Sequence, residues 1–284
     1  MPVIRIIADS SCDLRNTEYV KEFITVPVPI IFKERSFQDQ GDINIMDYFS
    51  AMKQSPHFPQ TSLPSPQSFI NAFSAAEPAD DIICITASSK ISGIFNSANI
   101  AKRIAEEEGL VSARIHLVDS KNVSIGMALF IRTALDMVKN GEVIGDILAR
   151  LEEMTRTVSM YFVLDTLKYA IKGGRLSGLK PMVGQLLNIK PVLYFDEGVV
   201  RDVDRIFKQK QIEEWLVKKF FKSALSFEQA AIAQGDALAR AGSLEARLKA
   251  KAPGIRILIQ EVGLAVGAYA GPGVIGIAFE EKNK

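Results

Sequence analysis

Cysteine and histidine are scarce in this chain of 284 residues. The two cysteines, Cys12 and Cys84, are too few for a disulfide framework or for a metal site built on four cysteines. The two histidines, His57 and His116, do not form an H-x-x-x-H pair, and no C-x-x-C motif occurs. The sequence therefore predicts neither a disulfide-stabilised fold nor a bound metal.

The shortage of histidine also limits catalysis by a serine or threonine hydroxyl, which needs a base within hydrogen-bond reach. His116 falls in the strand pattern Arg-Ile-His-Leu-Val, and His57 lies in a proline-rich loop. Because no G-x-S-x-G elbow occurs either, a serine esterase is not expected. The G-x-x-x-x-G-K-[ST] phosphate loop is missing as well, so the sequence predicts no ATP site of that kind.

An excess of charge of one sign is also missing. The 34 Lys and Arg residues against 33 Asp and Glu residues give a formal net charge of +1, which provides no overall attraction to nucleic acid or to a membrane surface. The first residues lack the basic region and the long apolar stretch of a signal peptide. Together with the low cysteine content, this favours the cytoplasm.

One charge-free run, residues 262–279, reaches the 18 residues that a transmembrane helix needs at least. Gly271-Pro272-Gly273 would break a helix in the middle of this run, so we predict a strand, a tight loop and a closing strand instead. The run also matches G-x-G-x-x-G up to Gly276. Only eight residues follow Gly276, too few for the helix and the acidic residue that a dinucleotide site requires.

What the sequence does contain is an alternation of apolar strands and helices. Pro27 and Pro29 should push one of the strands to a sheet edge or give it an irregular start. Such alternation is typical of βαβ units around a mainly parallel sheet. In the first half we predict strands at 3–8, 25–32, 81–86 and 113–118, with helices that begin at Ser65-Pro66, run through 100–105 up to Gly109, and cover 144–154.

The second half continues the pattern without any internal repeat. Asp196-Glu197-Gly198 is typical of a hairpin turn. A change of pattern near residue 156 predicts two domains, a mainly parallel-sheet α/β domain at 1–156 and a second α/β domain at 157–284. We predict strands at 158–164, 191–195 and 199–203 and near 230 and 255, and helices near 182–187, 211–221 and 236–249.

Hydroxyl-rich loops follow several predicted strands. Ser88-Ser89-Lys90-Ile91-Ser92-Gly93 joins a strand to a helix, and open α/β sheets bind ligands at the carboxyl ends of their strands. The start of the helix supplies free N–H groups that suit an anion. A helix-capping serine in a solvated loop is the alternative. For three further segments the alternative is a polar turn at the surface. They are Thr61-Ser62-Leu63-Pro64-Ser65, Asp9-Ser10 and Asp119-Ser120.

In combination, these segments resemble the DegV family, the fatty-acid-binding subunits that work with fatty acid kinases. The resemblance runs nearly from end to end and in order. The segments that carry it are Ala8-Asp9-Ser10, 61–65, 88–93, Val118-Asp119-Ser120, Leu167-Lys168-Tyr169, Lys172-Gly173-Gly174-Arg175, Leu187-Asn188-Ile189-Lys190-Pro191 and Gly271-Pro272-Gly273.

The resemblance implies a lipid-binding protein with no catalytic residues and no cofactor, whose ligand is one long-chain fatty acid such as palmitate or oleate. It implies that Thr61 and Ser92 bond the carboxylate at the domain junction and that the acyl chain enters an apolar tunnel in the first domain. A separate ATP-using kinase then forms an acyl phosphate. The carboxylate site would comprise Thr61, Ser62, Ser92, Gly93 and Tyr269, supported by Asp9, Ser10, Asn96, Asp119, Ser120 and Gly271.

The chain departs from the family in two places. The family's Gly-Thr-His-x-Gly-Pro-Gly loop here reads Gly-Ala-Tyr-Ala-Gly-Pro-Gly, so Tyr269 replaces the histidine that helps to hold the headgroup. Ile94-Phe95 also stands where many relatives have threonine and tyrosine. The tyrosine hydroxyl either bonds the headgroup or lies in water while the ring packs beside the loop.

Basic residues of the second half form a further group. Their role is either to dock the kinase or to form a solvated charged surface. Two rival functions also stay open, an enzyme that acts on a small phosphorylated or acylated substrate at the same loops, and a sensor of apolar ligands. The basic residues are Lys168, Lys172, Arg175, Arg205 and Lys208.

Overall fold

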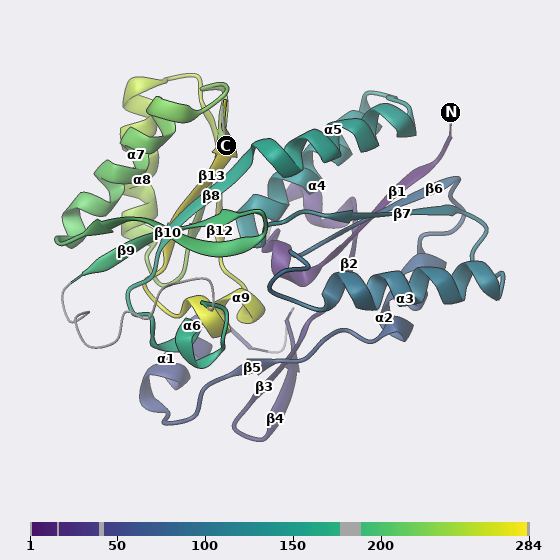
Figure 1. Cartoon of the computed structure of the whole chain (residues 1–284), viewed down its shortest axis with the longest axis horizontal. Coiled ribbons are helices and arrows are strands. Elements are labelled where there is room, and N and C mark those ends of the chain that lie inside the picture. The colour runs from purple at the N-terminus through teal and green to yellow at the C-terminus, as the bar shows by residue number, and fades with distance from the viewer. Residues whose placement is uncertain (1, 16, 40–42, 177–188, 283–284) are drawn as a thin grey trace.

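The computed structural model describes residues 2–15, 17–39, 43–176 and 189–282, and its elements are arranged in layers (Figure 1). A four-stranded parallel sheet in the order β2-β1-β6-β7 forms the first half. This confirms the parallel sheet that the alternation predicted. Its strands are β1 (Ile4–Asp9), β2 (Ile24–Val26), β6 (Asp81–Thr86) and β7 (Arg114–Asp119).

Helices cover both faces of this sheet, with α2 and α3 on one face and α4 and α5 on the other (Figure 1). α2 begins as predicted, because the Ser65 side chain accepts from the backbone N–H of Ser68 and Pro66 needs no partner at the first position. The helices are α2 (Pro66–Ala75), α3 (Ile94–Glu107), α4 (Ser124–Lys139) and α5 (Ile144–Thr157), with the short 3₁₀ turns η1 (Ser10–Cys12) and η2 (Glu18–Lys21).

The predicted strand at 25–32 is wrong as a single strand. Pro27 and Pro29 lack the N–H groups that a continuous ladder needs, and the chain changes sheets between β2, an edge strand, and β3. β3 belongs to a small antiparallel sheet in the order β4-β3-β5. This sheet comprises β3 (Pro29–Phe32), β4 (Arg35–Gln38) and β5 (Gln60–Thr61), and α1 (Ile45–Gln54) precedes β5.

The second half is a six-stranded sheet in the order β10-β9-β8-β13-β11-β12. Among the described strands of this sheet, only the pair β11 and β12 is parallel. β9 and β10 form the hairpin predicted at 196–198, where Glu197 and Gly198 both have positive φ. The strands are β8 (Val158–Val163), β9 (Lys190–Asp196), β10 (Val199–Ile206), β11 (Gln229–Gln234), β12 (Arg256–Glu261) and β13 (Ile275–Glu280).

The loop-and-strand prediction for residues 262–279 is half right. β13 is the closing strand, but a helix, α9, precedes the Gly-Pro-Gly loop instead of a strand. Short apolar runs do not distinguish the two by periodicity. The other helices of this half are α6 (Lys168–Lys172), α7 (Ile212–Ser223), α8 (Leu238–Lys251), α9 (Leu264–Ala270) and the turn η3 (Gln209–Gln211), while the helix predicted at 182–187 lies outside the described residues.

α4 lies between the two large sheets and contacts β1 and β6 of one and β8, β11 and β13 of the other. Residues 124–132 are all buried, as expected of a helix enclosed on every side. One apolar core therefore extends from Ile4 to Ala278, and a second lies between the six-stranded sheet and α7 and α8.

The predicted domain boundary at residue 156 lies next to the end of α5 at Thr157, and the division into two domains stays a prediction. No helix among the described residues is long and apolar enough to cross a membrane.

Candidate functional site

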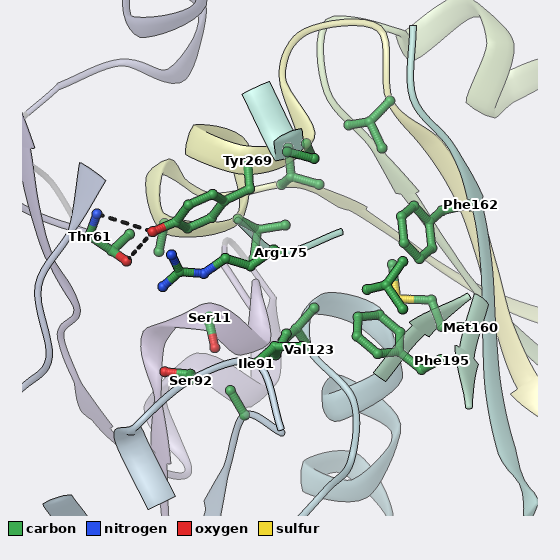
Figure 2. Close-up of a pocket in the computed structure, with 18 of the residues that line it drawn as sticks. Ser11, Thr61, Ile91, Ser92, Val123, Met160, Phe162, Arg175, Phe195 and Tyr269 are labelled. Atoms are coloured by element: carbon green, nitrogen blue, oxygen red, sulfur yellow. Dashed lines mark hydrogen bonds between the residues drawn. The ribbon is translucent and has the colours of Figure 1, made fainter. Parts of the chain in front are cut away.

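An apolar cavity lies where the two halves meet (Figure 2). Its volume is about 120 Å³. The family resemblance implies an acyl tunnel in the first domain, whereas both halves line this cavity. Its apolar lining includes Val28, Ala87, Ile91 and Val123 from the first half and Met160, Phe162, Leu164, Phe195, Val200, Ala265 and Val274 from the second.

The few polar side chains of the lining gather at one end. Figure 2 shows Ser11, Ser92 and Thr61 on one side of the cavity with Arg175 and Tyr269, and Met160, Phe162 and Phe195 on the other. A cavity that is apolar along its length and polar at one end matches an amphiphile with a single anionic headgroup.

Tyr269 and Thr61 join the two halves at this polar end. The Tyr269 hydroxyl lies 2.6 Å from Thr61 Oγ1 and accepts from the Thr61 backbone N–H at 3.3 Å. The Arg175 guanidinium lies 4.4 Å from the centre of the Tyr269 ring, and its Nη1 donates to the Gly173 carbonyl at 2.6 Å. The hydroxyl therefore has a protein partner at the polar end of the cavity.

Ser92 comes from the loop between β6 and α3. Its backbone N–H donates to the Ser88 carbonyl at 3.1 Å, and its hydroxyl accepts from the Ile94 N–H at 3.3 Å. The Ser92 hydroxyl thus occupies the Ile94 N–H at the start of α3, and Gly93, the N-cap residue, has no side chain to bond the other N–H groups of the first turn. A Cβ added at Gly93 would lie 2.8 Å from Leu63, which ties this loop to the loop that carries Thr61.

Ser11 is a cavity residue that the sequence did not single out. Both its backbone N–H and its hydroxyl donate to Asp9 Oδ1. Asp9 Oδ2 accepts from the Ala87 N–H at 2.7 Å, and burial raises the pKa of Asp9. Asp9 thus supports the cavity wall from behind. The run Ala-Asp-Ser-Ser contains the signal, but only the fold decides which serine faces the cavity.

The other predicted residues do not line the cavity, and some of them form hydrogen bonds behind it. Ser10 lies outside the lining and donates to Asp39 Oδ2 at 2.9 Å. Ser120 is buried and bonds the Thr86 carbonyl, whereas Asp119 accepts from the Ser89 and Lys121 N–H groups. Ser62 and Asn96 are exposed and do not line the cavity.

Gly271 shapes the site through its backbone. Its φ of +70° suits glycine, and an added Cβ would lie 2.4 Å from the ring of Tyr169. The loop can therefore lie against α6 only with glycine at this position. This contact holds α6, which precedes Arg175, beside α9, which carries Tyr269.

Buried carboxylates of the first half hold the start of α9. Asp13 Oδ1 accepts from the Gly263 N–H at 2.8 Å, and the Asp39 carboxylate accepts from the Ala265 N–H. Arg15 pairs with Asp39 and bonds its backbone carbonyl at 2.7 Å. Burial raises the pKa of Asp13 to about 7 and also raises that of Asp39, against the opposing effect of Arg15. Residues far apart in sequence thereby fix the helix that carries Tyr269.

The basic residues predicted to dock a kinase lie in different parts of the second half. Arg175 lines the cavity, and the Lys168 amine lies 4.6 Å from the centre of the Tyr169 ring. Arg205 lies on β10 and Lys208 follows it, beside Phe207, which is 68% exposed. Their docking role stays a prediction.

Comparison with known proteins identifies the family. The model of the DegV family of uncharacterised proteins matches residues 3–282. The chain belongs to the DegV family. A DegV domain-containing protein of Deinococcus radiodurans is 30% identical over 284 residues, which cover 98% of each chain. The resemblance predicted from the motifs is thus confirmed.

Solved structures of DegV proteins have the same fold. A DegV family protein from Thermus thermophilus, described for its fatty acid binding, has a TM-score of 0.89 at 27% identity, over 98% of this chain and 99% of that one. DegV from Bacillus subtilis, described as a fatty acid binding protein, has a TM-score of 0.85 at 26% identity, over 99% of this chain and all of that one. The α/β fold predicted for this DegV chain is confirmed.

Proposed function

We propose that this protein binds one long-chain fatty acid in the cavity between its two halves, with the carboxylate at the end formed by Thr61, Ser92 and Tyr269. The observation that carries the proposal is the apolar cavity with one polar end. The similarity to DegV proteins described as fatty-acid-binding supports it. The fatty acid is the only ligand that this function requires, and it needs no cofactor.

The energetics favour such a ligand. Burial of about 14 methylenes at ~0.8 kcal/mol each gives on the order of 11 kcal/mol, part of which is lost to ordering of the chain. Burial of a carboxylate without hydrogen-bond partners would cost more free energy than burial of the acyl chain provides. Hydroxyl groups, a guanidinium and the N–H groups at a helix start form the charge-assisted bonds that compensate it.

We further propose that the bound carboxylate is the substrate of a separate ATP-dependent kinase in the cytoplasm. In that reaction a carboxylate oxygen attacks the γ-phosphorus of ATP, the bond from this phosphorus to the bridging oxygen breaks, and ADP leaves. The product is an acyl phosphate. In this proposal the kinase supplies the nucleotide and the catalytic groups, and this chain supplies the oriented fatty acid.

Native mass spectrometry of the purified protein tests the binding proposal. We expect one adduct with the mass of a long-chain fatty acid, which extraction and gas chromatography would identify. Protein that is free of lipid and that takes up neither palmitate nor oleate would contradict the proposal.

Tyr269→Phe tests the headgroup site. The change removes the hydroxyl that bonds Thr61 but keeps the ring under Arg175. We expect palmitate affinity to fall about tenfold, the usual effect of a lost hydrogen bond near a charged group. Tyr194→Phe is the matched control, because Tyr194 lies on β9 and does not line the cavity. Equal affinity of Tyr269→Phe and wild type in a calorimetric titration would remove the hydroxyl from the site.

A further inference from the structure

Ser11 lies at the polar end of the apolar cavity (Figure 2), and the Asp9 carboxylate lies behind it. The Ser11 backbone N–H donates to Asp9 Oδ1 at 3.1 Å, and the Ser11 hydroxyl donates to the same oxygen. Asp9 Oδ2 accepts from the Ala87 N–H at 2.7 Å. Within the described ranges Asp9 thus bonds three donors and no acceptor, which is the pattern of an ionised carboxylate.

Asp9 keeps this charge without a cation in contact with it. Its side chain is fully buried, and among the described residues it forms no salt bridge. Burial raises the pKa of Asp9, and the charge of Asp39 raises it further. A further negative charge nearby would therefore favour protonation of Asp9. The titratable side chains that interact with Asp9, directly or through Asp39, are Asp39, Cys12, Cys84, Asp13 and Arg15.

These neighbours do not compensate the charge of Asp9. Burial raises the pKa of both thiols, Cys12 and Cys84, so they stay neutral. The Arg15 guanidinium is paired with Asp39. Asp9 therefore depends on its three hydrogen-bond donors to remain ionised.

A fatty-acid headgroup at the polar end of the cavity lacks a hydrogen between itself and Ser11. A hydroxyl has one O–H, and that of Ser11 is directed at Asp9. An ionised headgroup is an acceptor only, so it cannot bond the lone pairs that remain. Arg175 of the same lining offers a positive charge but does not supply this hydrogen.

The headgroup and Asp9 would also repel each other across Ser11. Two O–H···O spacings of about 2.7 Å in series place two carboxylates no more than ~5.5 Å apart. At such a separation two like charges in a buried site disfavour joint ionisation, and one carboxylate takes up a proton.

We infer that the fatty acid binds together with one proton, which Asp9 takes up from solvent and holds behind Ser11. The inference deepens the proposed function and rests on it. The acid O–H of Asp9 donates to the Ser11 oxygen, and the Ser11 O–H turns to the headgroup, while Oδ2 keeps the bond from Ala87. An anionic ligand and one proton enter together, so the complex carries the same charge as the free protein. Asp9 is thus a positioning residue that acts on the ligand through Ser11.

Calorimetric titration of the wild-type protein with laurate, in buffers of different ionisation enthalpy, counts the protons that are taken up with each ligand. Laurate is a soluble fatty acid that is ionised near neutral pH. Between about pH 6 and about pH 9 we expect the uptake to reach about one proton. The affinity should then fall by close to tenfold for each pH unit over which Asp9 is ionised in the free protein and protonated in the complex.

Asp9→Asn separates the proton from the other roles of the side chain. The amide keeps an oxygen that accepts from Ala87 and provides a permanent donor to Ser11. We expect this variant to bind laurate without proton uptake, with an affinity that changes less than about twofold over the same pH range. At high pH it should bind at least as tightly as wild type.

Asp119→Asn is the matched control. Asp119 also accepts backbone N–H groups at the end of a strand, from Ser89 and Lys121, and it does not line the cavity. Its replacement should leave the proton uptake of wild type unchanged. Loss of the uptake in Asp119→Asn as well would show that the proton is not held by Asp9.

The outcomes separate the two proposals. Failure of both laurate and palmitate to bind wild type would contradict the fatty-acid function itself. Binding without proton uptake at any pH in this range would contradict the role of Asp9 alone. If folded Asp9→Asn loses affinity by the same factor at every pH, the carboxylate is a structural acceptor and the inference is wrong.

Discussion

Val200→Trp is expected to lower fatty-acid affinity by about 200-fold. Val200 lies on β10, is 5% exposed and lines the apolar cavity. An indole at this position would occupy space that the acyl chain needs. Displacement of about four methylenes at ~0.8 kcal/mol each costs about 3 kcal/mol of binding free energy, which corresponds to the 200-fold loss.

Val203→Trp provides the control for this experiment. Val203 lies on the same strand but is 46% exposed and does not line the cavity. Its replacement should leave affinity within twofold of wild type. Thermal unfolding of both variants separates a blocked cavity from a damaged fold. A Val200→Trp protein that is folded and binds palmitate as wild type does would show that the acyl chain lies elsewhere.

Asp39→Ala is expected to destabilise the protein by about 3 kcal/mol, the lower end of the range for removing one partner of a buried ion pair, because the Arg15 side chain that remains is 24% exposed. Asp39 is fully buried. The change leaves the Arg15 guanidinium without its carboxylate, and the Ser10 hydroxyl and the Ala265 N–H without their acceptor. Because Ala265 lies in the first turn of α9, the loss should also loosen the helix that carries Tyr269.

Urea unfolding followed by circular dichroism measures this effect. Glu106→Ala is the matched control, because the Lys102–Glu106 pair is a carboxylate–cation contact on the surface of α3, at 3.5 Å. Removal of such an exposed pair should cost less than about 0.5 kcal/mol. A loss below about 1 kcal/mol for Asp39→Ala would mean that the carboxylate contributes little to holding α9.

Elements with strong local signals could be predicted from the sequence. The strand at 81–86 agrees to the residue, because a short apolar run is bounded by polar residues at both ends. The start of α2 agrees as well, because Ser65 and Pro66 form a cap that depends on neighbouring residues alone. α9 could not be predicted in this way, because its first turn is held by Asp13, which is 250 residues away in the sequence.

The residues of the candidate site also divide into those with a local sequence signal and those without one. Thr61, Ser92 and Tyr269, which line the cavity, could be singled out because each lies in a motif that can be recognised along the chain. The apolar wall formed by Met160, Phe162 and Phe195 was missed. These residues are ordinary core residues by their local pattern. Only the packing of the two sheets around α4 leaves space beside them.

The position of β13 has a consequence for how the chain folds during synthesis. β13 leaves the ribosome after all the other described strands, yet it pairs with β8 on one side and β11 on the other, in the middle of the six-stranded sheet. The four parallel strands and their helices are complete by residue 157 and have time to form earlier. Until β13 emerges, β8 and β11 expose unpaired edges. The nascent protein therefore passes through a stage at which its first half is complete while the six-stranded sheet lacks a central strand and is open to aggregation.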